Sequence, residues 1–303
     1  MNPVLKGYLR LARPANLPTA AADVLAGVAI AGVFIGVFLN KDWNTSVVGD
    51  VLLLVFSSVF LYAAGVVLND VFDHKLDKTE RPERPIPSGL VSVRSAAIFG
   101  GVLMNLGVLF SFLVGPVSGM VAVTLGLSIL LYDALGKHHS FFGPLNMGVC
   151  RGLNLLLGIT ILGDFGNWGY IIFPVLYIAA ITLISRGEVH GDNKNHIIFA
   201  GGLYSTVILG IVVLFSTAGL NLLEAIPFLL LFAFLIFRPL LKAYAENSPK
   251  NIKKAVMAGV ISIIVLDASL AVGFSHWWVG LIIILLLPLS IFFIKTVRSY
   301  LTF

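Results

Sequence analysis

Ten long apolar runs dominate this chain of 303 residues. A helix of roughly 20 apolar residues crosses a bilayer core about 30 Å thick, and each run is close to that length. Only 12% of the residues are charged, about half the share in a soluble domain, so a soluble globule is excluded. The runs cover residues 17–39, 50–70, 93–114, 116–134, 142–163, 169–185, 197–218, 221–241, 253–274 and 277–297.

The basic residues fall almost entirely on one side of this map. Of the 20 Lys and Arg residues, all except Lys41 and Arg151 lie in the N-terminus, the even-numbered loops or the tail. Because cytoplasmic loops carry the excess of positive charge, both termini are predicted to be cytoplasmic. We expect a single polytopic domain, residues 1–303, in the cell inner (plasma) membrane. The chain lacks a basic face interleaved with aromatic residues, so its positive charge does not indicate nucleic-acid binding. The lone Cys150 excludes a disulfide framework.

A dense group of acids lies at the end of the second run, in the segment NDVFDHKLDKTERPERPIPSG from Asn69 to Gly89. Asp70, Asp73 and Asp77 are spaced i, i+3 and i+7, which on a continuous helix places three carboxylates on one face. Such carboxylates repel one another unless a divalent cation neutralises them, and Mg²⁺ favours one or two carboxylates together with phosphate oxygens. The segment therefore predicts a Mg²⁺ site that holds a diphosphate.

The same segment has a simpler interpretation as a solvated helix end. Lys75 and Lys78 are then partners of the acids along the helix surface. The position at the mouth of a transmembrane helix, where uncompensated charge is costly, favours a functional site. Arg81 and Arg84 either bind phosphate or belong only to the positive loop, and the sequence leaves both interpretations open.

The segments NDVFDHKLD and RPERPIPSG resemble the first aspartate-rich motif and following loop of the UbiA superfamily of intramembrane prenyltransferases. Three further stretches also resemble this family, namely RPANLPTAAADVLAG, LYDALGK and NMGVCRGLNLLLG. The resemblance implies an all-α bundle of nine transmembrane helices over residues 8–274, with 277–297 as an additional tenth. It also implies that a polyprenyl diphosphate binds through Mg²⁺ at Asn69, Asp70, Asp73 and Asp77, and that Tyr132 and Lys137 contribute to diphosphate binding.

The family's second acidic motif is expected after the sixth run, where this chain reads SRGEVHGDNKNH from Ser185 to His196. The chain departs from the family here, because Ser185 stands where members commonly carry an aspartate. Glu188 and Asp192 match the remaining acids, and on a helix their i, i+4 spacing places them on one face. The resemblance thus implies a second Mg²⁺ site with fewer carboxylates than the family commonly has. The stretch is also similar to the EboC group of UbiA-like proteins in bacterial ebo clusters.

A few ionisable or amide side chains lie within the apolar runs. Arg151 is expected to face the cavity and to pair with an aspartate or with the diphosphate, and a purely structural ion pair is the alternative. Asn154, one turn further on, either binds substrate or joins helices, and the second interpretation is favoured. For Asp23 and Asp267, hydrogen bonding between helices is favoured over catalysis.

These observations predict a prenyltransferase in which Mg²⁺ stabilises the departing diphosphate and an unidentified acceptor attacks the resulting carbocation. No side-chain nucleophile is required, and the chain shows no Ser/His/Asp or Cys/His arrangement. One alternative is a non-catalytic protein on the same scaffold that binds or transports lipid or isoprenoid, which Ser185 makes credible. A phosphoryl-alcohol transferase is disfavoured, since its DGxxAR pattern is missing.

Overall fold

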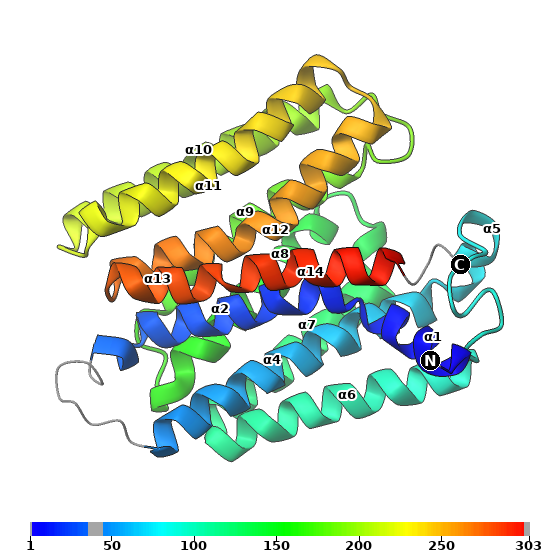
Figure 1. The fold of residues 1–303 in the computed structure, drawn as a ribbon, viewed down its shortest axis with the longest axis horizontal. Coiled ribbons are helices and arrows are strands. Elements are labelled where there is room, and N and C mark those ends of the chain that lie inside the picture. Colours follow the sequence, from blue (N-terminus) through cyan, green and yellow to red (C-terminus); the bar gives the residue numbers. More distant parts are fainter. Residues whose placement is uncertain (1, 36–44, 300–303) are drawn as a thin grey trace.

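The computed structural model describes residues 2–35 and 45–299, and within these ranges the chain forms helices and turns but no strand (Figure 1). Eight of the described helices are long and apolar enough to cross a membrane, so the chain is a multi-pass membrane protein. In chain order the elements are α1 (Pro3–Ala12), η1 (Pro14–Asn16), α2 (Leu17–Ile30), α4 (Thr45–Phe72), α5 (His74–Glu80), α6 (Val93–Val114), α7 (Pro116–Ala134), η2 (Gly136–His138), α8 (Phe142–Ile159), η3 (Thr160–Leu162), η4 (Trp168–Ile171), α9 (Ile172–Ser185), α10 (Lys194–Thr217), α11 (Leu222–Ala245), α12 (Pro249–Gly273), α13 (Trp277–Ile284) and α14 (Leu286–Ser299).

The predicted all-α membrane fold is confirmed, and the runs 93–114 and 116–134 coincide with α6 and α7. The predicted run 17–39 is only partly described, because α2 ends at Ile30 and residues 36–39 lie outside the described ranges. The final run is divided between α13 and α14. Pro288 explains this division, since it has no N–H to donate to the carbonyl of Ile284. The count of nine helices plus a tenth stays a prediction.

Local signals explain where several helices begin. The side chain of Ser92 accepts a hydrogen bond from the N–H of Ser95 and caps α6. Ser248 caps α12 in the same way through the N–H of Asn251. Pro116 opens α7 at the first helical position, where its missing N–H costs no helical hydrogen bond. These residues set the first turns of α6, α7 and α12.

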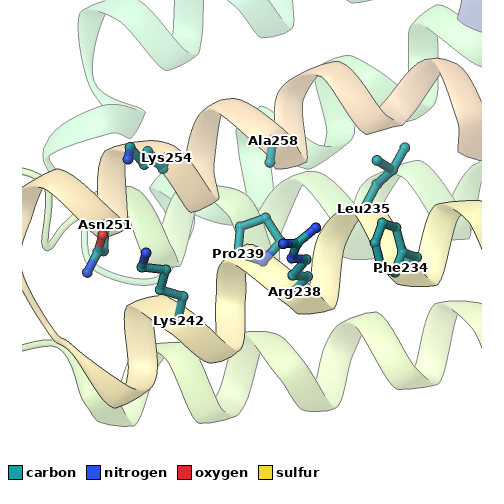
Figure 2. A pocket seen from close by; sticks show the side chains of 8 residues that line it. All are labelled: Phe234, Leu235, Arg238, Pro239, Lys242, Asn251, Lys254 and Ala258. Carbon is teal, nitrogen blue, oxygen red and sulfur yellow. The ribbon is translucent and has the colours of Figure 1, made fainter.

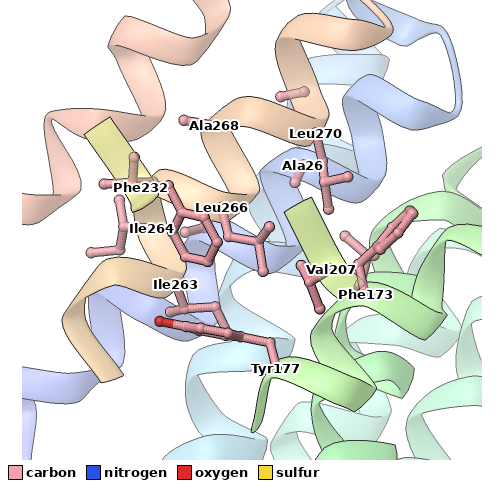
Figure 3. Packing of buried hydrophobic residues seen from close by; sticks show 14 of the residues in the cluster. Ala26, Phe173, Tyr177, Val207, Phe232, Ile263, Ile264, Leu266, Ala268 and Leu270 are labelled. Atoms are coloured by element: carbon pink, nitrogen blue, oxygen red, sulfur yellow. The ribbon is translucent and has the colours of Figure 1, made fainter. Parts of the chain in front are cut away.

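Helix α12 lies at the centre of the bundle and packs against α2, α9, α11 and α13. Its residues from Ser262 to Gly273 are all buried. Figure 3 shows Ile263, Ile264 and Leu266 of this helix packed among side chains of neighbouring helices, including Tyr177 of α9. The Tyr177 hydroxyl donates a hydrogen bond of 2.7 Å to the carbonyl of Gly259, so the aromatic ring is buried with its polar atom paired.

Helix α12 is also one member of a closed ring of six helices. Helix α2 packs against α4, α8 and α12, while α4 packs against α6 and α7, and α8 packs against α7 and α9. Helices α10 and α11 run side by side along one flank of the molecule (Figure 1) and contact α9 and α12 respectively. The ring of α2, α4, α7, α8, α9 and α12 is the part of the fold that positions the site described below.

Two glycines let α2 and α8 touch backbone to backbone. A Cβ atom on Gly27 would lie well inside van der Waals contact with the carbonyl oxygen of Leu155, and one on Gly158 would meet the carbonyl of Val24 in the same way. Neither carbonyl can rotate away as a flexible side chain can. The approach of these two helices therefore depends on both glycines.

We expect Gly27→Ala to destabilise the protein by about 1–3 kcal/mol, the usual cost of overpacking. The measurement is the thermal unfolding midpoint in detergent. Gly101→Ala in α6 is the matched control, because a Cβ atom there has no neighbour within 4 Å. Equal midpoints for the two variants would show that α2 and α8 can separate without cost.

Candidate active site

A cavity of about 440 Å³ lies inside the ring of helices. Leu125, Ile129, Ile178 and Ile181 are among the side chains that make part of its wall apolar. Such a chamber can hold an apolar chain while polar groups orient a polar or charged part of the same ligand. Its polar lining comprises Arg13, Thr19, Ser58, Tyr62, Asn69, Tyr132, Asp133, Cys150, Arg151, Asn154, Thr182 and Ser185.

Four of the residues singled out in the sequence line this cavity, namely Asn69, Tyr132, Arg151 and Asn154. They come from α4, α7 and α8, which are neighbours in the ring. The predicted acids lie close by, because Asp70 directly follows Asn69 at the end of α4. The structure therefore brings the first acidic motif to the mouth of the cavity.

The chain turns at Asp73, between the end of α4 at Phe72 and the start of α5 at His74. The expected continuous helix through the first motif is therefore wrong at this residue. Backbone hydrogen bonds from Asp73 to Asn69 and from Asp77 to Asp73 keep the segment compact across the break. As a result, Asp73 has a different partner from Asp70 and Asp77.

Asp70 and Asp77 meet at one guanidinium group. Nη1 of Arg84 lies 3.1 Å from Oδ1 of Asp70 and 2.6 Å from Oδ2 of Asp77. Arg13, at the end of α1, adds a second contact of 2.6 Å from its Nη2 to Oδ1 of Asp70. The two carboxylates are only 4% and 3% exposed, so these cations supply the charge compensation that burial requires.

Asp73 pairs with Lys137, 64 positions further along the chain, at 2.5 Å between Oδ1 and Nζ. Lys137 lies in η2, directly after α7, so this contact joins the ends of α4 and α7. Of the two loop arginines considered in the sequence, Arg84 reaches the acids, whereas Arg81 is exposed. The mouth thus holds three carboxylates and the three cations Arg13, Arg84 and Lys137.

Asp133 is a site residue that sequence reasoning missed. Its Oδ1 accepts a hydrogen bond of 2.9 Å from the amide of Asn69. Its Oδ2 has no hydrogen-bond partner among the described residues, although the residue is only 3% exposed. The available signal was an acid at the end of an apolar run, which usually marks function. An unpaired buried carboxylate oxygen is costly, and a cation is the partner that would relieve the cost.

The second acidic motif does not form the expected helical face. After α9 ends at Ser185, residues 186–193 form turns and irregular backbone. Gly191 and Asp192 adopt positive φ angles of 72° and 51°, and the amide of Asn193 donates to the carbonyl of Ile184 and closes the loop. The prediction that Glu188 and Asp192 share one face is therefore wrong, because left-handed backbone interrupts the helix between them.

Neither acid of this loop lines the cavity. Asp192 is exposed and Glu188 is half-buried. Burial raises the pKa of the Glu188 carboxyl above its ordinary value, while Lys253 and Arg81 act in the opposite direction. Ser185, by contrast, does line the cavity, so the position where the family commonly has an aspartate faces the site.

Arg151 both lines the cavity and pairs with an aspartate. Its Nε lies 2.7 Å from Oδ2 of Asp23 in α2, and its Nη2 donates to the carbonyl of Thr19 at 2.6 Å. Asp23 is fully buried and Arg151 is 8% exposed. A charged pair this deep in the bundle places a guanidinium beside the cavity without an unpaired charge.

Asn154 joins three helices, as favoured in the sequence. Its amide donates to the carbonyl of Ala20 and to Asp23, at 3.0 and 2.7 Å, and its oxygen accepts from Ser58 of α4 at 2.7 Å. Asp267 of α12 is also fully buried. The hydrogen bonding between helices expected for Asp23 and Asp267 is supported, since the side chains of these two acids share a hydrogen bond between α2 and α12.

The side chains at the mouth fit Mg²⁺ by their chemistry. No three acidic, histidine or cysteine side chains in the described ranges are already gathered around a metal position, because the first-motif carboxylates face Arg13, Arg84 and Lys137. The donors are nevertheless all oxygens, as Mg²⁺ prefers. Asp70 and Asp77 already converge on one positive group, and the unpaired Oδ2 of Asp133 lacks a cation.

The comparisons with known proteins agree with this geometry. A model of the UbiA prenyltransferase family matches residues 27–261. A digeranylgeranylglyceryl phosphate synthase from Methanococcoides burtonii is 36% identical over 163 residues, which cover 54% of this chain and 57% of the relative. The synthase of the same name from Sulfolobus acidocaldarius is 29% identical over 270 residues, covering 81% of this chain and 91% of the relative.

The chain spans about half the length of the curated relatives it matches first. A solved structure of a UbiA homolog from Archaeoglobus fulgidus, bound to GPP and Mg²⁺, has a TM-score of 0.62 at 14% identity and covers 83% of this chain and 99% of the homolog. This likeness shows a shared fold.

Proposed function

Because this chain belongs to the UbiA prenyltransferase family, we propose that it transfers a prenyl group from a polyprenyl diphosphate to an acceptor inside the membrane, with Mg²⁺ as its metal ion. The observation that carries the proposal is an apolar-walled cavity whose mouth joins Asp70, Asp73 and Asp77 to three cations. The walls suit an isoprenoid tail and the mouth suits a diphosphate. The homolog bound to GPP and Mg²⁺ supports this class of ligand.

The residues at the mouth divide into metal ligands and diphosphate ligands. Asp70, Asp73, Asp77 and Asp133 would hold Mg²⁺ at the mouth, and Glu188 and Asp192, which do not line the cavity, would hold a second Mg²⁺ ion from the loop after α9. When bound, Mg²⁺ supplies the positive charge that stabilises a departing diphosphate. Arg13, Arg84 and Lys137 then turn from the carboxylates to phosphate oxygens, for which arginine is well suited.

The rest of the cavity orients the donor and excludes water. Asn69 and Tyr132 line it beside the mouth and offer hydrogen-bond donors to the diphosphate. The apolar wall keeps water from the allylic carbocation until the acceptor attacks it. Arg151 and Asn154 line the cavity and are held in place by Asp23, so they offer the acceptor a fixed polar surface.

The orientation in the membrane follows from charge. We propose that the mouth and both termini face the cytoplasm and that the membrane is the cell inner membrane, because nearly all Lys and Arg residues lie on that side of the predicted map. Lys137, Arg84 and Arg13, which gather at the mouth, are among them. The donor then enters from the side on which soluble prenyl diphosphates occur.

The acceptor can belong to one of three chemical classes. The name shared by the relatives states that they make digeranylgeranylglyceryl phosphate, which favours a lipid-linked glyceryl phosphate over an aromatic or sugar acceptor. An experiment should therefore offer all three classes. Purified protein in nanodiscs is incubated with prenyl diphosphates, Mg²⁺ and each acceptor, and new lipids are identified by mass spectrometry.

Formation of a prenylated product together with Mg²⁺-dependent release of diphosphate is the expected result. Binding of the donor without release would instead support the non-catalytic alternative, a lipid or isoprenoid carrier on the same scaffold. Asp133 gives a second test of the site that does not depend on the acceptor.

We expect Asp133→Asn to raise the Mg²⁺ concentration for half-maximal activity about tenfold, because the amide lacks the negative charge and the unpaired oxygen Oδ2 that would bind the ion. Binding of Mn²⁺ in the presence of inorganic pyrophosphate, followed by electron paramagnetic resonance, should weaken in parallel. The double variant Asp133→Asn with Ser185→Asp should recover part of the loss, since Ser185 also lines the cavity. Unchanged Mn²⁺ binding in Asp133→Asn would exclude this residue from the metal site.

A further inference from the structure

A second hollow lies between α11 and α12, away from the central cavity. It has a volume of about 360 Å³, and none of its lining residues belongs to the cavity described above. Figure 2 shows basic side chains and an aromatic ring along this groove. The lining residues are Phe234, Leu235, Arg238, Pro239 and Lys242 from α11, and Asn251, Lys254 and Ala258 from α12.

The groove is polar at one end and apolar at the other. Lys242, Asn251 and Lys254 lie at one end in Figure 2, and Phe234 and Leu235 lie at the other. Eight residues of helix separate Phe234 from Lys242, which corresponds to about 12 Å along α11. This gradient matches a molecule with a charged head and an apolar tail.

Three positive charges of the groove have no salt bridge with any carboxylate in the part of the chain that the structure describes. They belong to Arg238, Lys242 and Lys254, which are all exposed. The guanidinium of Arg238 rests 5.6 Å from the ring centre of Phe234. The nearby acid Glu246 accepts a hydrogen bond of 2.9 Å from Asn251 instead. The positive charge of the groove therefore favours an anionic ligand.

The groove opens to lipid at the same end of the bundle as the diphosphate mouth. Lys253, next to Lys254, acts electrostatically on Glu188 together with Arg81 of the loop that follows the first motif. Around the apolar end, Leu230, Leu231 and Met257 are exposed on the surface of membrane-spanning helices. An anion that binds here and fills the apolar end would therefore carry an apolar chain, as a phospholipid does.

We propose that this groove is a binding site for an anionic phospholipid. The phosphate lies among Arg238, Lys242 and Lys254, and one acyl chain follows Leu235, Phe234 and Ala258 towards the membrane interior. Basic pockets between transmembrane helices recognise anionic headgroups in this way. The site is separate from the prenyl transfer site and does not depend on the proposed function.

The experiment titrates phosphatidylglycerol into the full-length protein in a neutral detergent and counts bound lipid by native mass spectrometry. The variant R238Q/K242Q/K254Q is expected to bind phosphatidylglycerol about a hundredfold more weakly. Ala258→Trp fills the apolar end with the charges intact and should also weaken binding. The matched control K75Q/K78Q/R94Q removes three exposed cations outside the groove and should bind as the wild type does.

Weakening in both groove variants, with an unchanged control, supports the site. Wild-type binding by both groove variants would overturn it. An equal loss in the control would show general charge attraction in place of a site. Displacement of the lipid by millimolar inorganic phosphate, with Ala258→Trp unaffected, would show a site for free phosphate and would also overturn the proposal.

Discussion

Replacing Asp73 with alanine is expected to lower prenyl transfer about a thousandfold at saturating Mg²⁺. The carboxylate lies at the mouth of the cavity, 2.5 Å from the Nζ atom of Lys137. Under the proposed function, its loss removes a ligand that would hold Mg²⁺ and also frees Lys137, which would align the diphosphate. The measurement is the rate of diphosphate release from a prenyl diphosphate by the purified variant in nanodiscs.

Asp164→Ala is the matched control for this variant. Asp164 is exposed in the turn between η3 and η4, beyond the end of α8 that lies farthest from Lys137. The control should turn over as the wild type does. Undiminished turnover by Asp73→Ala itself would refute the role of the first motif, whatever the acceptor proves to be.

Asp23→Leu is expected to cost about 3–5 kcal/mol of stability, because it leaves the guanidinium of Arg151 buried without its counterion. The pair is held at 2.7 Å between α8 and α2, and Asp23 also accepts a hydrogen bond from Asn154. The other neighbours of Arg151 include the neutral carbonyl of Thr19 and the neutral ring of Tyr62, whose centre lies 5.9 Å from the guanidinium carbon. The free energy of unfolding in mixed detergent micelles measures this loss.

The double variant Asp23→Leu with Arg151→Met distinguishes the ion pair from simple packing. Removing both charges together leaves no unpaired ion, so most of the loss should be recovered. If the stability lost by the double variant equals the sum of the losses of the two single variants, each residue contributes to stability independently. Asp267→Asn is expected to be coupled to both substitutions, since the side chain of Asp267 shares a hydrogen bond with that of Asp23 and acts electrostatically on Arg151.

The helices were predictable because hydropathy is a local property. A run such as 93–114 carries in its own residues the apolar length that a membrane demands, and α6 has those bounds. The family resemblance, confirmed by the match over residues 27–261, was equally local, since it rested on contiguous segments. The finer resemblance to the EboC group stays a prediction.

The partners of the acids were not predictable in the same way. Asp73 and Lys137 are 64 positions apart. The family resemblance assigned both to diphosphate binding, but no pattern in either segment indicates that they pair with each other. The side-chain amide of Asn69 likewise donates a hydrogen bond to Asp133, which is also 64 positions away. The i, i+4 spacing of Glu188 and Asp192 predicted that they share one helix face. This prediction was wrong, because the backbone at Gly191 and Asp192 is left-handed and no helix forms there.

Taken alone, the sequence determined that this chain crosses the membrane many times, which family it belongs to, and which acids crowd the end of α4. Only the tertiary structure decided that Arg84 joins Asp70 to Asp77, that Asp133 is left with an unpaired oxygen, and that α11 and α12 enclose a basic groove. The reason is physical. Hydrophobic length acts within one segment, whereas charge compensation in a buried site depends on which segments packing brings together.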